Sequence, residues 1–150
     1  MKKMRIVIGC DHAGFELKRW VQKRVRALGY SIVDVGSRRL KPGDDYPDYA
    51  KAMAEVIQKG KAKRGILICG SGVGASIAIN KFKGIRAALC ENTFSAHQGV
   101  EDDDANVLCL GARVTGPELA MELVDAFLHA HFSNADRHRR RVQKVISFER

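Results

Sequence analysis

Short apolar segments that alternate with amphipathic patterns constrain this sequence more than any other feature. Each segment is rich in aliphatic residues and is bounded by glycine or polar turns, which is typical of a buried strand. Segments that are apolar throughout predict burial on both faces, and strands that alternate with helices predict a parallel sheet. We therefore expect an α/β fold, with helices on both faces of a five-stranded sheet formed by residues 4–10, 30–36, 65–69, 85–90 and 106–111.

The segments between these strands carry helical periodicity. Shorter helices are expected near residues 73–81 and 93–101, and Thr115 with Glu118 has the spacing of a capping box at the start of the last long helix. The expected core stripes of the long helices are Leu17, Trp20, Val21, Val25 and Leu28, then Ala50, Met53, Ala54 and Ile57, and finally Leu119, Leu123, Val124, Phe127 and Leu128.

The composition suits one globular domain over residues 1–150, with 45 % hydrophobic residues. No apolar run is long enough to cross a membrane, and the first residues do not form a signal peptide. The four cysteines lack metal-ligand spacing, so we expect reduced thiols in the cytoplasm. The net charge of +9 favours acidic partners, either phosphorylated small molecules or nucleic acid, although a solvated surface would give the same excess.

A glycine-rich turn follows the third predicted strand, directly after a cysteine. The stretch CGSGVG (69–74) lacks the G-x-G-x-x-G spacing of a dinucleotide site and the lysine of a P-loop. A cysteine phosphatase loop would need an arginine six places after Cys69, where this chain has Ala75. The surviving interpretation is an anion cradle, because glycines let backbone N–H groups crowd around an oxyanion.

The same positive potential would stabilise a thiolate at Cys69. A thiolate beside such a cradle can remove a proton from a carbon next to a carbonyl, while the cradle holds the resulting enediolate. The alternative is a buried and inert cysteine at the end of a strand. The glycines that follow Cys69 favour the catalytic interpretation.

Other polar residues gather after predicted strands, where ligands bind in parallel α/β folds. Asp11 and His12 follow the first strand and can hydrogen-bond sugar hydroxyls, although Asp11 alone would also suit a helix N-cap. Arg113 follows the fifth strand.

A basic cluster lies near the end of the chain, where Arg137 and Arg141 share one helical face. That spacing suits clamping a phosphate. Nucleic-acid binding is the rival, but no aromatic residues are interleaved for base stacking, and a solvated helix end is a third possibility. Apolar residues in the same region predict a contact with a second subunit, namely Val142, Val145, Ile146 and Phe148.

Over nearly its whole length the sequence closely resembles ribose-5-phosphate isomerase type B, a family that includes galactose-6-phosphate isomerase subunits. The matching stretches, in the right order, are GCDHAG, DYPDYA, GILICGSGVGASIAINKFKGIRAALC, NVLCLGARV and RHRRRV. The resemblance implies a Rossmann-like three-layer α/β sandwich, active as a homodimer or homotetramer. It also implies an isomerase that interconverts ribose 5-phosphate and ribulose 5-phosphate, with no metal and no organic cofactor.

Matching motifs imply roles for individual residues. Cys69 corresponds to the catalytic base, and Ser71 stands in the cradle where many members have threonine. The sugar contacts correspond to Asp11, His12 and Tyr46, the cradle to Gly70, Ser71, Gly72, Val73 and Gly74, and the phosphate contacts to Arg113, Arg137 and Arg141. The last two arginines are expected to reach across a subunit interface.

One position departs from the family pattern. Where the family commonly has a histidine that opens the furanose ring, followed by asparagine, this chain has Asp102 and Asp103. Histidine suits ring opening because its ordinary pKa is about 6.5, whereas an aspartate at about 3.9 is a poor proton donor at neutral pH. Asp102 itself, His97 and His12 are all candidates for this step.

The departure leaves alternative functions open. A tetrulose phosphate, too short to form the ring, or a hexose 6-phosphate could be the substrate. A non-catalytic module that binds phosphorylated ligands or nucleic acid could also keep the cradle, although binding alone needs no thiol at Cys69.

Overall fold

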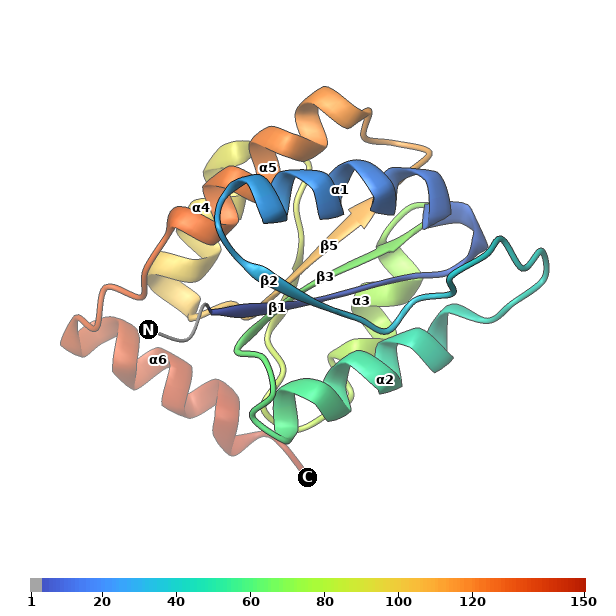
Figure 1. Ribbon diagram of the computed structural model, residues 1–150. Coiled ribbons are helices and arrows are strands. Elements are labelled where there is room, and N and C mark those ends of the chain that lie inside the picture. The colour runs from blue at the N-terminus through green and yellow to red at the C-terminus, as the bar shows by residue number, and fades with distance from the viewer. Residues whose placement is uncertain (1–3) are drawn as a thin grey trace.

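The computed structural model describes residues 4–150, and over that range it contains one five-stranded sheet covered by helices (Figure 1). The strands are β1 (Arg5–Cys10), β2 (Ser31–Asp34), β3 (Arg64–Cys69), β4 (Ala87–Leu89) and β5 (Val107–Gly111). The helical elements are the short 3-10 turn η1 (His12–Gly14), α1 (Phe15–Ala27), α2 (Tyr46–Gln58), α3 (Val73–Ile79), α4 (Thr93–Asp103), α5 (Pro117–His129) and α6 (Asp136–Ser147).

The sheet has the strand order β2-β1-β3-β5-β4, and every neighbouring pair is parallel. Figure 1 shows α1, α4 and α5 on one face of the sheet and α2 and α3 on the other. The predicted three-layer, Rossmann-like α/β fold is therefore confirmed. None of the helices in residues 4–150 combines the length and the apolar character needed to cross a bilayer.

The core forms because successive residues of the central strands point to opposite faces. Ile6 and Ile8 of β1 enter the cluster beneath α1, α4 and α5, whereas Val7 enters the cluster beneath α2 and α3. In β3, Ile68 belongs to the first of these clusters and Leu67 to the second. Each buried aliphatic side chain of this size contributes about 1.5–3 kcal/mol relative to an exposed one. The fully apolar strands of the sequence therefore stabilise both layers.

Several local predictions were wrong. Trp20 was expected in the core but is 53 % exposed, because Leu17, Val21 and Val25 already form the buried stripe of α1. Leu119 is likewise exposed at the edge of its helix. The capping box does not form, since Gly116 is the N-cap of α5 and makes no side-chain cap bond.

The boundaries of several elements also differ from the prediction, and the second strand, expected at residues 30–36, spans only Ser31–Asp34. The fourth strand is shorter than expected, because only Ala87–Leu89 pair with β5. The helix after it continues past Glu101 to Asp103, and Asp104 ends it in the left-handed conformation with φ of 51°. Asp102 and Asp103 are therefore helical, although the sequence placed them in the turn before the next strand.

Because the strands are parallel, the sheet has two chemically different ends. We call the end that contains Cys69 and Gly111 the carboxyl edge, and the end that contains Arg64 and Val107 the amino edge. Six residues of β3 separate the edges by about 20 Å. In Figure 1, α6 lies beside the amino edge, away from the turn that follows Cys69.

Candidate active site

The thiol of Cys69 lies at the carboxyl edge, where β3 ends and a glycine turn leads into α3. The residue is only 4 % exposed, and the Gly72 N–H donates to its Sγ over 3.2 Å. Gly72 has a φ of +81°, in the left-handed region that favours glycine. This backbone conformation therefore aims an N–H group at the sulfur and fixes the position of the thiol beside the glycine turn.

A cavity of about 260 Å³ opens beside this turn. Its lining consists of Asp11, Tyr46, Cys69, Gly70, Ser71, Gly74 and Arg113. Gly74 sits against the ring of Tyr46, since a Cβ at Gly74 would lie 2.6 Å from the Tyr46 Cζ atom. The structure therefore brings together, from three strand ends and the start of α2, most of the residues predicted at this edge.

Arg113 supplies the positive charge of the cavity. It follows β5, the neighbour of β3, and its backbone N–H donates to the Gly70 carbonyl over 2.9 Å. The guanidinium lies over the glycine turn, because a Cβ at Gly70 would be 3.4 Å from an Arg113 terminal nitrogen. A phosphate in this cavity would meet both a guanidinium and the start of α3.

Asp11 holds the turn after β1 in place. It is buried, and its Oδ1 accepts hydrogen bonds from the backbone N–H groups of Ala13 and Gly14, at 3.0 and 3.2 Å. The N-cap role considered for Asp11 is therefore present. Because Asp11 also lines the cavity, the structural role and a sugar contact are compatible.

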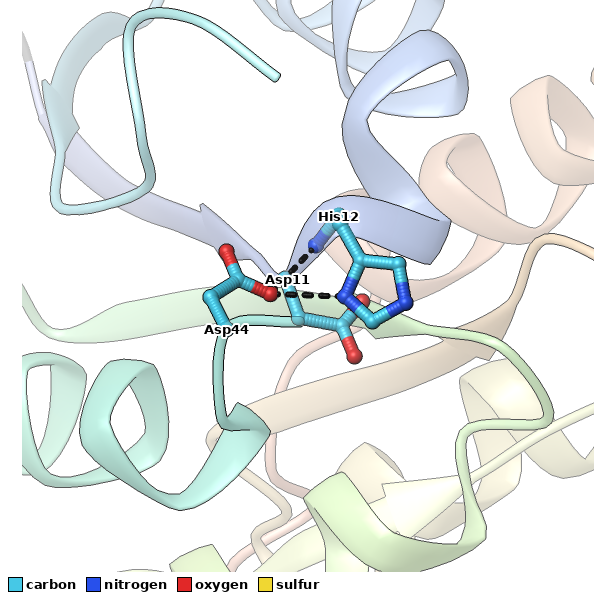
Figure 2. Close-up of side chains that lie close together, drawn as sticks. All are labelled: Asp11, His12 and Asp44. Carbon is cyan, nitrogen blue, oxygen red and sulfur yellow. Dashed lines mark hydrogen bonds and ion pairs between the residues drawn. The ribbon is translucent and has the colours of Figure 1, made fainter. Parts of the chain in front are cut away.

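His12 forms a pair with Asp44, which lies just before α2 (Figure 2). The Asp44 Oδ1 atom lies 2.7 Å from the imidazole Nδ1 and accepts the His12 backbone N–H over 2.9 Å. The other oxygen of Asp44 accepts the Tyr49 hydroxyl over 2.8 Å. Burial acts to raise the pKa of Asp44, but these hydrogen bonds outweigh it and lower that pKa. Burial and the Asp44 carboxylate raise the pKa of Tyr49 to about 12.

The ligand atoms of Asp11, His12 and Asp44 lie within 4.8 Å of one another, so this group could be considered for a metal ion. The Asp44 oxygens, however, already accept three hydrogen bonds, and the Asp11 Oδ1 accepts two. These bonds account for the cluster without a cation. The predicted absence of a metal stays a prediction.

The remaining predicted site residues lie elsewhere, toward the amino edge. Asp102 and Asp103 are on the last turn of α4, whereas Arg137 and Arg141 are exposed on α6. Asp102 accepts from the Gln98 amide over 2.7 Å and lies 3.5 Å from His138. None of these four lines the cavity that contains Cys69. Within one described chain, the predicted site is therefore divided between two edges.

Three residues that the sequence did not single out take part in these clusters. Asp44 and Tyr49 support His12, but no signal distinguishes Asp44 from the other acids of its loop. His138 is buried, with Nδ1 2.5 Å from the Ser133 hydroxyl and Nε2 facing Asp102. Its spacing of four from Val142, which is also buried, could have revealed that it lies on the inner face of α6.

An apolar groove of about 530 Å³ lies beside the edge strand β4. It is lined by Asn80, Ile85, Arg86, Ala87, Ala88, Gly99, Asp103, Ala105, Val142, Val145, Phe148 and Glu149. Phe148 is 77 % exposed and Val145 is 52 % exposed. Val145 and Phe148, which the sequence predicted to contact a second subunit, are therefore only partly covered within the described chain.

Comparison with known proteins agrees with this arrangement. A family model described as Ribose/Galactose Isomerase matches residues 6–145. The chain is 46 % identical over 145 residues to a probable ribose-5-phosphate isomerase B of Mycoplasma pneumoniae, covering 97 % of this chain and 95 % of that protein. It is also 42 % identical over 129 residues to a D-erythrulose-4-phosphate isomerase of Pectobacterium atrosepticum, covering 86 % of this chain and 85 % of that protein.

A solved structure shows the same fold. The structure of ribose-5-phosphate isomerase B from Mycoplasma genitalium with bound ribulose-5-phosphate superposes with a TM-score of 0.93 at 38 % identity. The match covers 99 % of this chain and 97 % of that one.

Proposed function

Since the chain belongs to the ribose/galactose isomerase family and is a sugar-phosphate isomerase, we propose that it interconverts ribose 5-phosphate and ribulose 5-phosphate. The observation that carries the proposal is the cavity in which Cys69, the glycine turn and Arg113 meet. A proton-transferring group, an oxyanion cradle and a cation for phosphate are the parts that this reaction needs. All three belong to one chain and one edge of the sheet.

In the proposed reaction the Cys69 thiolate removes the proton from C2 of the open-chain aldose. The C1 carbonyl becomes an enediolate oxygen, which the N–H groups of residues 70–74 and the Ser71 hydroxyl stabilise. The O2 hydroxyl passes its proton to O1, and the thiol returns the proton to C1 as the C2=O2 bond forms, which gives the ketose. The hydrogen bond from the Gly72 N–H to the sulfur holds the Cys69 side chain in place during this cycle.

The proposal includes a homodimer, because one chain holds the predicted phosphate ligands at opposite edges. Arg113 is at the cavity, whereas Arg137 and Arg141 lie about the length of a strand away, on α6. A two-fold axis would bring the amino edge of one subunit to the carboxyl edge of the other. The apolar groove beside β4 and the exposed Phe148 supply a surface for that contact.

A second substrate has specific support. Asp102 stands where ring opening is expected from histidine, and one relative is named for erythrulose 4-phosphate, a sugar that cannot form a furanose ring. A tetrose phosphate would need only the Cys69 chemistry. We therefore keep an erythrose 4-phosphate isomerase as the alternative.

The proposal treats residues 1–150 as one isomerase domain in the cytoplasm. A single sheet runs through the described chain, and the family match spans nearly all of it. All four cysteines, which fall in the described part, are free, as suits a reducing compartment.

The test is a coupled assay of the wild-type enzyme on aldose and ketose phosphates of four, five and six carbons. We expect the highest kcat/KM on the pentose pair. Preference for the tetrose pair would show that the chain is an isomerase whose substrate is a four-carbon sugar phosphate. Tight phosphosugar binding without turnover of any pair would instead support a non-catalytic module.

A further inference from the structure

We propose that His12 and Asp44 act as an acid–base pair that opens the furanose ring of the substrate, an inference that rests on the proposed pentose isomerase. Ribose 5-phosphate is mainly a ring, and the ring has no carbonyl. Cys69 can act only after the ring opens. Opening requires one group that takes a proton from the anomeric hydroxyl and gives one to the ring oxygen.

The geometry of the pair sets the role of each imidazole nitrogen. A carboxylate only accepts hydrogen bonds, so the 2.7 Å contact with Asp44 places the hydrogen of the neutral imidazole on Nδ1. The Nε2 atom of that tautomer carries a lone pair and is the free base. Figure 2 shows this second nitrogen on the side of the ring away from Asp44.

Asp44 is itself held in position. Its Oδ1 accepts two N–H groups of His12, and its Oδ2 accepts the Tyr49 hydroxyl. The Asp44 side chain is only 12 % exposed, whereas that of His12 is 35 % exposed. The pair therefore has a partly buried carboxylate that orients an accessible imidazole, which is the arrangement of a general base and its supporting carboxylate.

The pair lies next to the cavity of Cys69. A ring nitrogen of His12 is within 4.8 Å of the Asp11 carboxylate, and Asp11 lines that cavity. Tyr46, two residues after Asp44, lines it as well. The carboxylates of Asp11 and Asp44 both lie close to the imidazole, and Tyr49 donates to Asp44 on the side away from His12's contact.

The step balances without a co-reactant. Nε2 takes the proton from the anomeric O1–H, the C1–O4 bond breaks as the C1=O1 bond forms, and the imidazolium gives its proton to O4. Both oxygens are attached to C1, so one imidazole reaches both. Asp44 stabilises the imidazolium between the two transfers. The product is the open aldehyde on which Cys69 acts.

Two other histidines of the described chain are less suited to this step. His138 is buried, and both of its ring nitrogens face partners, Ser133 and Asp102. The Nδ1 of His97 pairs with Glu101, one turn further along α4. No residue of α4 lines the cavity, whereas Asp11, the neighbour of His12, does.

The test compares Asp44→Asn and His12→Gln with the wild-type enzyme on ribose 5-phosphate and on erythrose 4-phosphate, which needs no ring opening. Loss of general acid–base catalysis should lower kcat/KM on the pentose by about 100-fold. The tetrose should be affected far less, so the ratio of the two activities should shift by at least about tenfold. Asp45→Asn, which removes the adjacent charge but no contact of His12, is the matched control and should keep the wild-type ratio.

A second readout uses the pentose alone. When ring opening is lost, the rate at high enzyme concentration should stop rising and level off at the spontaneous ring-opening rate. The wild-type rate should continue to rise with enzyme concentration. A merely structural role of Asp44 would lower the slope but give no plateau, and Tyr49→Phe should show a smaller effect of the same kind.

Equal losses on both sugars, or no plateau, would overturn the inference while leaving the isomerase intact. A wild-type enzyme that turns over the tetrose but not the pentose would overturn the proposed substrate, and the role of the pair with it. Retained tetrose activity shows that each variant is folded.

Discussion

The two edges of the sheet each carry a histidine–aspartate pair, and the pairs differ in which of the two side chains is accessible to solvent. At the carboxyl edge, Asp44 is the less exposed partner and the imidazole of His12 is accessible beside a cavity. At the amino edge, His138 is buried and the carboxylate of Asp102 is one-third exposed. The same two residue types therefore leave an imidazole accessible at the carboxyl edge and a carboxylate accessible at the amino edge.

The edges also differ in how they are built. The carboxyl edge is formed largely by backbone, since strand ends and a glycine turn with a positive φ place the Gly72 N–H at the Cys69 sulfur. The amino edge is formed by side chains on two helices, α4 and α6. The first edge gathers the groups that we propose for proton transfer, whereas in the proposed homodimer the second edge would contribute to the cavity of the other subunit.

The largest effect is expected at the carboxyl edge, from Cys69→Ala. Removing the proton-transferring group should lower kcat by at least about 10³-fold on pentose and tetrose phosphates alike. Binding of ribose 5-phosphate, measured by calorimetry, should survive because the cradle and Arg113 remain. Substantial turnover by this variant would show that another group removes the proton.

The amino edge is tested by Arg137→Ala and Arg141→Ala. Loss of a charged hydrogen-bond partner should raise the KM by roughly 10- to 100-fold, which corresponds to about 1.5–3 kcal/mol. Lys144→Ala, on the same helix and exposed, is the control for lost charge. An unchanged KM would show that the two arginines do not bind the substrate phosphate. A salt titration of nucleic-acid binding would then decide between a nucleic-acid site and a solvated surface.

Mixing variants decides whether the two edges meet between subunits. Cys69→Ala and the double variant Arg137→Ala/Arg141→Ala are each impaired alone. In an equal random mixture, about half of the dimers contain one subunit of each variant. One of the two sites in such a dimer has both edges intact, so the mixture should reach about a quarter of wild-type activity. A site completed within one chain would give no recovery on mixing.

Sequence patterns predicted the carboxyl edge well because its parts are contiguous along the chain. Cys69 and the glycines that follow it form one motif, and motifs after parallel strands must share an edge. The role of Asp44 could not be predicted, since it depends on how a loop folds back over His12, 32 positions away. Trp20 was misplaced because periodicity does not show which side of a broad apolar stripe meets the sheet.

A pH dependence should test whether the hydrogen bonds to the Asp44 carboxylate stabilise the fold. Because hydrogen bonds lower the pKa of Asp44 in the folded protein, it stabilises the fold above its unfolded pKa of about 3.9, and this contribution is lost as the pH falls through the folded value. Urea unfolding of the wild type and Asp44→Asn should therefore differ most near neutral pH and converge below about pH 4. A difference between the two proteins that is the same at every pH would contradict this role of the Asp44 carboxylate.

The smallest effect is expected from Asp102→Asn, which alters the other histidine–aspartate pair. Asp102 is partly exposed and 3.5 Å from His138, and such ion pairs contribute about 0–1 kcal/mol. The variant keeps a polar group for Gln98 and His138, so kcat/KM on ribose 5-phosphate should change by less than about fivefold. Asp44→Asn makes the same substitution at the carboxyl edge. The losses of kcat/KM in the two variants therefore compare the two edges directly. A plateau at high enzyme concentration with Asp102→Asn, but not with Asp44→Asn, would place ring opening at the amino edge and make the His12 pair the structural one.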